Sequence, residues 1–124
     1  MKYLLDTHVL IWFAEDNKKL SKDFKDIISN QNNIIFVSVA SVWETVIKLQ
    51  LKKMKLKSSI REIIKEYEFE IVNIKMEHVL ELQKLPNIHK DPFDRLLISQ
   101  AIVENMTLVS ADTKFPKYQV NLLW

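Results

Sequence analysis

The sequence predicts a single α/β domain with a parallel sheet. Five short apolar runs alternate along the chain with segments of helical periodicity, which is the pattern of strand–helix–strand units. The runs are almost continuously hydrophobic, as expected for strands covered by helices on both faces. The chain has 124 residues, 48% of them hydrophobic, and no internal repeat or linker divides it. We therefore expect one core and one domain over residues 1–124.

The first half of the chain begins with a strand and continues through helices to a second strand. Residues 2–6 contain the apolar run of the first strand, and residues 8–14 are predicted to be a helix that Asp16-Asn17 breaks. Ser21 is a predicted N-cap of a helix with apolar residues on one face. The β-branched run 34–37 is typical of a buried strand. Residues 39–53 are predicted to be helical because apolar side chains recur every three or four positions.

The second half repeats the alternation. Ser59 begins a helix over 59–67, since Ser59-Ile-Arg-Glu62 has the form of a capping box. The longest helix of this half begins at Asp91-Pro92, because aspartate is a favoured N-cap and proline is favoured at the first helical position. The predicted elements of this half are a helix at 59–67, a strand at 69–74, helices at 77–85 and 92–105, and strands at 107–110 and 120–123.

Glycine and cysteine are both absent from the sequence. A chain without glycine has no phosphate-binding loop, no dinucleotide-binding fingerprint and no nucleophile elbow. A chain without cysteine has no disulfide, thiol nucleophile or cysteine-ligated zinc. Left-handed helix ends should then fall on Asn or Asp, and the candidates are Asn17, Asn32, Asn33 and Asn105.

The net charge of +2 is weak support for a nucleic-acid partner. Residues 2–14 have the outline of a signal peptide, but Asp6, Thr7 and His8 interrupt the apolar stretch and two acids follow it. No apolar run approaches the roughly 18–20 residues of a membrane helix. We expect a cytoplasmic protein.

Acidic residues follow the predicted strands. Asp6 ends the first strand, Glu44 lies one turn into the helix after the second, and Asp112 follows the strand at 107–110. Asp91 and Asp94 open the helix that leads into that strand. Sites in open parallel sheets form at the carboxyl ends of the strands, so these acids should meet at one edge.

Each acid also has a structural explanation. Ser41-Val-Trp-Glu44 and Asp91-Pro-Phe-Asp94 both have capping-box form. Asp6 fits a turn, and Asp112-Thr113 fits an Asx turn. Capping accounts for each acid singly, but it gives no reason for all of them to fall at the same edge of a sheet.

Clustered carboxylates favour a hard divalent cation. Two carboxylates about 5 Å apart repel by roughly 3 kcal/mol at an effective dielectric near 20. Magnesium relieves that repulsion, because it takes oxygen ligands, keeps several waters and leaves positions for a phosphate. Such an ion activates water for attack on phosphorus. The acids therefore predict metal-dependent phosphodiester hydrolysis.

The sequence resembles the PIN-domain nucleases, and within them the VapC-like toxins of toxin–antitoxin pairs. The motifs that carry the resemblance are Leu5-Asp6-Thr7-His8, Ser38-x-x-Ser41-x-x-Glu44, Asp91-Pro-Phe-Asp94-Arg-Leu-Leu-Ile98 and Leu108-Val-Ser-Ala-Asp112-x-x-Phe115. They match the family's four acidic motifs in order, from residue 3 to the end of the chain.

The resemblance implies a three-layer α/β/α sandwich with strand order 3-2-1-4-5. It implies that Asp6, Glu44, Asp94 and Asp112 form a pocket for Mg²⁺ or Mn²⁺, with Asp91 left as the N-cap. Ser110 is then expected to contact a water at the metal. The implied activity is endoribonuclease cleavage of RNA by a toxin that forms a homodimer and is inhibited by a small antitoxin.

Other polar residues have weaker assignments. Arg95 and Lys48 are candidate substrate contacts, and Lys48, Lys52, Lys53, Lys55 and Lys57 form a basic run that suits either RNA backbone or solvent. His8, His89 and Lys90 are more often structural or solvated, and Trp12, Phe13 and Trp43 more often pack in a core or interface than stack on bases.

Two alternative functions remain at this point. A PIN-like domain that only binds RNA or protein would lack metal binding that depends on Asp6 or Asp94. A phosphorelay receiver domain should carry paired acids after the first strand and an aspartate at the end of a middle strand. Here Asp6 stands alone and Val72-Asn73 ends that strand.

Overall fold

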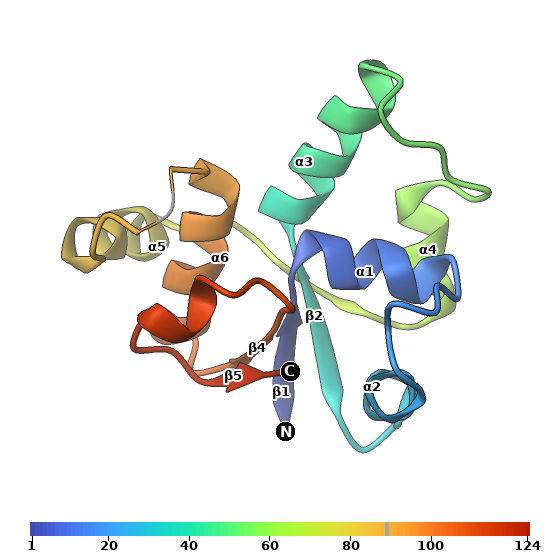
Figure 1. The fold of residues 1–124 in the computed structure, drawn as a ribbon, viewed down its shortest axis with the longest axis horizontal. Coiled ribbons are helices and arrows are strands. Elements are labelled where there is room, and N and C mark those ends of the chain that lie inside the picture. Colours follow the sequence, from blue (N-terminus) through green and yellow to red (C-terminus); the bar gives the residue numbers. More distant parts are fainter. Residues whose placement is uncertain (89) are drawn as a thin grey trace.

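A parallel five-stranded sheet forms the centre of the molecule, in the order β3-β2-β1-β4-β5 (Figure 1). The computed structural model describes residues 1–88 and 90–124. Leu5 at the end of β1 pairs with Val37 of β2 on one side and Val109 of β4 on the other. The strands are β1 (Lys2–Leu5), β2 (Ile34–Ser38), β3 (Glu70–Val72), β4 (Thr107–Val109) and β5 (Leu122–Leu123). The predicted parallel sheet and its strand order are confirmed.

Helices lie on both faces of this sheet (Figure 1). The predicted helix 39–53 ends three residues early, and the predicted helix 77–85 divides into α5 and the 3₁₀ turn η1 (Leu82–Lys84). The helices are α1 (Thr7–Ala14), α2 (Lys22–Ser29), α3 (Val39–Gln50), α4 (Ile60–Glu66), α5 (Met76–Glu81) and α6 (Pro92–Val103), and a second 3₁₀ turn, η2, spans Phe115–Lys117. In the part of the chain that the structure describes, no helix has the length and apolar character needed to cross a membrane.

Alternation along the strands divides the core into two layers. Tyr3 and Leu5 face the layer under α1, α2 and α4, which includes Leu10 and Ile63. Leu4 faces the opposite layer, with Leu97 of α6 among its neighbours. Side chains alternate between faces along a strand, so one short apolar strand supplies both cores. The result is the predicted α/β/α sandwich.

The order of the strands reverses at β1, because the strands that follow it in the chain lie on both of its sides. The chain leaves β1 through α1 and α2 to reach β2 on one side, whereas β4 lies on the other side. Helix α3 stands above the carboxyl ends of these strands, where it contacts both α1 and α6 (Figure 1). This is the switch point at which open α/β sheets place their sites.

Four helices end in left-handed residues without glycine. Asp16, Lys52, Glu68 and Asn105 have φ between 52° and 57°. Each of these helix ends has the two backbone hydrogen bonds of a Schellman motif. At the end of α4, for example, the Phe69 N–H donates to the Ile64 carbonyl and the Glu68 N–H donates to the Lys65 carbonyl. Asp16 and Asn105 agree with the prediction that such positions fall on Asn or Asp, but Lys52 and Glu68 contradict it.

The prediction is also wrong for Asn17, Asn32 and Asn33, which do not occupy such positions. Asn17 instead accepts the Lys19 N–H in a local turn, and the Asn33 side chain donates to the Ile27 carbonyl. The side-chain amides of Asn17 and Asn33 thus fix the loops through hydrogen bonds, while the left-handed positions lie where the helices end.

Candidate active site: an acidic pocket at the switch point

Asp6 is fixed at the end of β1. Its side chain caps α1 by accepting the Val9 N–H at 2.8 Å, and only 4% of the residue is exposed. Burial raises the pKa of Asp6, and the nearby Asp112 adds to the rise, while hydrogen bonds from Ser110 and Val9 and the proximity of His8 oppose it. The carboxylate is therefore held rigidly in an environment that resists its ionisation.

Glu44 lies on the buried side of α3 and is 8% exposed. Helix α3 follows β2 without a loop, and Ser38 is its N-cap through a hydrogen bond from the Ala40 N–H. Ser41 is therefore inside the helix, and the capping-box interpretation of Ser41–Glu44 is wrong. Glu44 forms an ion pair with Lys48 one turn later, at 3.1 Å.

Asp94 lies in the first turn of α6. Asp91 is the N-cap, as predicted, and accepts the backbone N–H groups of Phe93 and Asp94. Burial, followed by the charges of Asp91, Glu44, Asp112 and Asp6 in that order, raises the pKa of Asp94 to about 7. This carboxyl senses all the other acids of the set, so the structure brings together the four that the sequence predicted.

Asp112 follows β4 in a tight turn. Its carboxylate accepts the Lys114 N–H at 2.8 Å, which is the predicted Asx turn, and its own N–H donates to Ser110 Oγ at 3.1 Å. Ser110 is 1% exposed and also hydrogen-bonds Asp6. Ser110 thus joins the turn that carries Asp112 to the carboxylate at the end of β1.

A divalent cation fits this donor set, with water completing its shell. Among the described residues, no three Asp, Glu or His side chains are close enough to hold a metal ion by themselves. Magnesium needs only one or two direct carboxylates and retains several waters. Burial first, and then repulsion from the neighbouring carboxylates, raises the pKa of Asp94, and a cation relieves that repulsion.

The two residues predicted to contact the substrate, Arg95 and Lys48, both bind other groups of the protein. Arg95 donates to the carbonyls of Pro86 and Leu82, at 2.8 and 3.3 Å, and so holds the segment before α6. Lys48 binds Glu44. His8 and Lys90 are exposed, and His89 lies outside the described residues.

The aromatic residues mostly pack as expected. Trp12 and Phe13 rest against the core layer beneath α1. Trp43 is 55% exposed and meets Phe93 edge-on, with ring centroids 5.0 Å apart. Trp124, which had no predicted position, stacks on Phe24 with centroids 4.7 Å apart.

One contact at the site was not predicted from the sequence. Thr7 Oγ1 donates to Ser41 Oγ at 3.1 Å, and both residues are buried. The contact joins the first turn of α1 to α3 beside Asp6 and Glu44. The two residues are 34 positions apart, so only the placement of α3 over the sheet edge brings them together.

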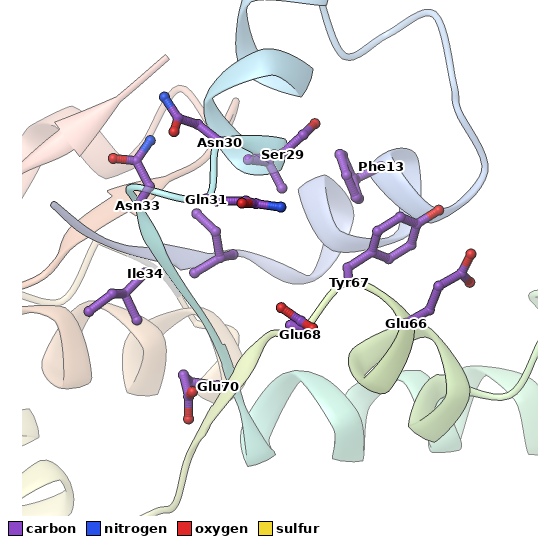
Figure 2. A pocket seen from close by; sticks show the side chains of 12 residues that line it. Phe13, Ser29, Asn30, Gln31, Asn33, Ile34, Glu66, Tyr67, Glu68 and Glu70 are labelled. Carbon is purple, nitrogen blue, oxygen red and sulfur yellow. The ribbon is translucent and has the colours of Figure 1, made fainter.

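A pocket of about 640 Å³ lies away from the acids. It is lined by the start of β2, the end of α2 and the α4–β3 connection (Figure 2). Glu66, Glu68 and Glu70 line it together with amide side chains, and no lysine or arginine does. Its charge disfavours a phosphate ligand, so its size does not make it the active site.

The fold and the cluster of carboxylates place the chain among parallel α/β proteins with an acidic site at the switch point of the sheet. Residues 3–121 match the PIN domain family. The chain therefore belongs to that family, whose members are generally nucleases that use a divalent metal ion.

Two solved structures have the same fold. One is VapBC2 from Rickettsia felis bound to a DNA fragment from its promoter, with TM-score 0.75, 21% identity, and coverage of 99% of this chain and 98% of the other. The second is VapBC-1 from nontypeable Haemophilus influenzae, with TM-score 0.63, 19% identity and coverage of 94% and 91%. Among curated protein sequences, none matches the chain significantly.

Proposed function

We propose that the protein is an endoribonuclease that depends on Mg²⁺ or Mn²⁺ and acts as the toxin of a toxin–antitoxin module. The observation that carries the proposal is the set of four carboxylates at the switch point, where burial and, after it, the neighbouring carboxylate charges raise the pKa of Asp94 to about 7. Such a set is suited to bind a cation and, through it, a phosphodiester.

Asp6 and Asp94 are the residues that would hold the metal ion. When bound, the ion neutralises charge on the scissile phosphate and lowers the pKa of the attacking water. Glu44 and Asp112 would complete the pocket and orient that water. Ser110 keeps Asp6 and the turn of Asp112 in a fixed relation through its two hydrogen bonds. Positioned in this way, the carboxylates need no rearrangement as charge develops.

The toxin assignment rests on the family and on the fold shared with two VapBC structures. We infer a small antitoxin as partner, a homodimer as the working form and the cytoplasm as the place of action. The match over residues 3–121 supports a single nuclease domain over residues 1–124. A short upstream reading frame for a DNA-binding protein would support the pairing with an antitoxin.

An RNA cleavage assay with acid-site variants tests the nuclease function. Wild type, Asp6→Asn and Asp94→Asn are purified in parallel and assayed on labelled RNA with Mg²⁺, with Mn²⁺ and with EDTA. We expect metal-dependent cleavage by the wild type and a loss of at least 100-fold in either variant, since each removes a metal-holding charge.

An exposed acid provides the control. Asp23→Asn, in the first turn of α2, should cleave like the wild type. Metal-dependent cleavage left intact in Asp6→Asn would contradict the assigned mechanism. Calorimetric titration with Mn²⁺ distinguishes the nuclease from a PIN-like domain that only binds RNA or protein. Such a non-catalytic domain would show no Mn²⁺ binding that depends on Asp6 or Asp94.

A further inference from the structure

A basic groove adjoins the acidic pocket on the side of α1. It has a volume of about 390 Å³ and lies between α1, the start of the α1–α2 connection, and the end of α3 with the segment that follows. Lys19, Lys48, Lys53 and Lys55 line it, and Glu15 is the one acid among its lining residues. We refer to this feature as the lysine groove.

The lysine groove is not the basic run that the sequence suggested. Of that run, Lys48, Lys53 and Lys55 line the groove, whereas Lys52 and Lys57 do not. Lys19 joins them from a distant part of the chain. Among the described residues, no carboxylate lies within ion-pair distance of Lys19, Lys53 or Lys55. Their charge is therefore available to a ligand.

The groove reaches the acids at two points. Thr7 lines it and is the residue after Asp6, and its hydroxyl is bonded to Ser41. Lys48 also lines it and pairs with Glu44 at 3.1 Å. The groove therefore borders the residue next to Asp6 and the ion-pair partner of Glu44.

Aromatic side chains form part of the same wall. Trp12 and His8 line the groove, with ring centroids 6.1 Å apart. Lys19 Nζ lies 5.8 Å from the centroid of the Trp12 ring. A positively charged groove with aromatic rings is the arrangement that proteins use for single-stranded nucleic acid, where lysines follow the backbone and rings stack on bases.

We propose that the lysine groove binds the single-stranded RNA segment next to the scissile phosphate, with Lys19, Lys53 and Lys55 on the backbone and Trp12 against a base. This inference rests on the proposed nuclease function, whose substrate it deepens. Duplex RNA is disfavoured, because its bases are stacked and inaccessible to Trp12.

The test measures binding without cleavage. A fluorescein-labelled single-stranded RNA of twelve nucleotides is titrated with the full chain in EDTA, and anisotropy is followed at several salt concentrations. For Lys53→Ala/Lys55→Ala we expect binding about tenfold weaker and a salt slope smaller by about 1.4, since each single-strand phosphate contact contributes about 0.7. For Trp12→Leu we expect binding about tenfold weaker with the slope unchanged, and Trp12→Phe should restore most of it.

Lys52→Ala/Lys57→Ala is the matched control, because it removes the same charge from the same run outside the groove. It should bind within about twofold of the wild type. Equal weakening by both double variants, or none by either, would overturn the proposal. Polyglutamate of equal charge tests an acidic protein segment as the occupant. Binding as tight as that of RNA, with the same dependence on Lys53 and Lys55, would also overturn it.

Failure of the groove and failure of the nuclease function give different results. RNA binding that depends on the lysine groove, without metal-dependent cleavage, would support the role of the groove and refute the proposed nuclease function. Metal-dependent cleavage lost in Asp6→Asn, with binding indifferent to Lys53→Ala/Lys55→Ala, would refute the groove alone. Circular dichroism spectra and thermal melts of each variant verify that it is folded.

Discussion

Neutralising Asp94 should stabilise the protein when no metal ion is bound. The carboxyl has an ordinary pKa of 3.8, which burial and four neighbouring carboxylates raise to about 7. The folded state therefore binds a proton more tightly than the unfolded state, and ionisation at higher pH costs folding free energy. Asp94→Asn removes that cost while keeping the shape of the side chain.

The size of the effect follows from the pKa difference. Each pKa unit corresponds to about 1.4 kcal/mol, so the difference between 3.8 and about 7 has a ceiling of about 4 kcal/mol. Asp94 is partly exposed, and solvent screening reduces the cost to about 2 kcal/mol. The penalty is absent below the unfolded pKa, grows between about pH 4 and pH 7, and is constant above.

Urea unfolding in EDTA at pH 4, 6 and 8 measures this profile. We expect Asp94→Asn to exceed the wild type by about 2 kcal/mol at pH 8, by less at pH 6, and to match it at pH 4. Millimolar Mg²⁺ or Mn²⁺ should then stabilise the wild type and leave the variant almost unchanged, because only the wild type has the full set of charges.

Two results would refute the reasoning. A variant less stable than the wild type at pH 8 would mean that Asp94 makes a favourable ionic contact that outweighs the repulsion. Equal stabilisation of both proteins by the metal ion would place the ion outside the acidic pocket. Asp23→Asn is the reference variant and should show no comparable gain between pH 4 and pH 8.

Two further predictions concern Ser110 and the left-handed helix ends. Ser110→Ala removes a hydrogen bond that lowers the pKa of Asp6, so the acid limb of the cleavage profile should move to higher pH; an unmoved limb would exclude Asp6 as the titrating group. Glu68→Gly should raise the free energy of unfolding by about 0.5–1 kcal/mol, because a left-handed residue with a side chain costs roughly 1–2 kcal/mol and the entropy of glycine offsets part of the gain. Glu66→Gly, at the last residue of α4, should instead lower it by up to about 1 kcal/mol in the same urea titration, and a loss in both variants would contradict the argument.

Local signals in the sequence predicted most of the fold. Ser21, Ser59 and Asp91 cap the helices that they were expected to begin, since capping depends on a few consecutive residues. The apolar runs predicted the strands because most strand residues are apolar and buried, although β3 contains the exposed residues Glu70 and Ile71. Strands β3 and β5 are shorter than predicted, since the length of a strand depends on its pairing partner as well as on its composition.

Features that depend on contacts between distant residues were missed. The sequence could not distinguish Ser38 from Ser41 as the cap of α3, because the chain passes from β2 into the helix without a loop. The Thr7–Ser41 hydrogen bond and the place of Lys19 in the lysine groove need the whole fold. The Glu44–Lys48 pair was within reach, because oppositely charged residues four positions apart on a helix are neighbours.

The structural and chemical explanations of the acids are complementary. Asp6 caps α1 and Asp94 lies in the first turn of α6, so helix N-termini with their partial positive charge hold both carboxylates in place. Capping alone does not produce a pocket, as Ser59 shows by capping α4 through the Glu62 N–H without facing a strand end. What distinguishes the site is convergence, because these helices begin where α3 and the turn after β4 bring further carboxylates, Glu44 and Asp112, within range. The caps fix the acids, and the repulsion that remains between them is what a cation and a phosphate would relieve.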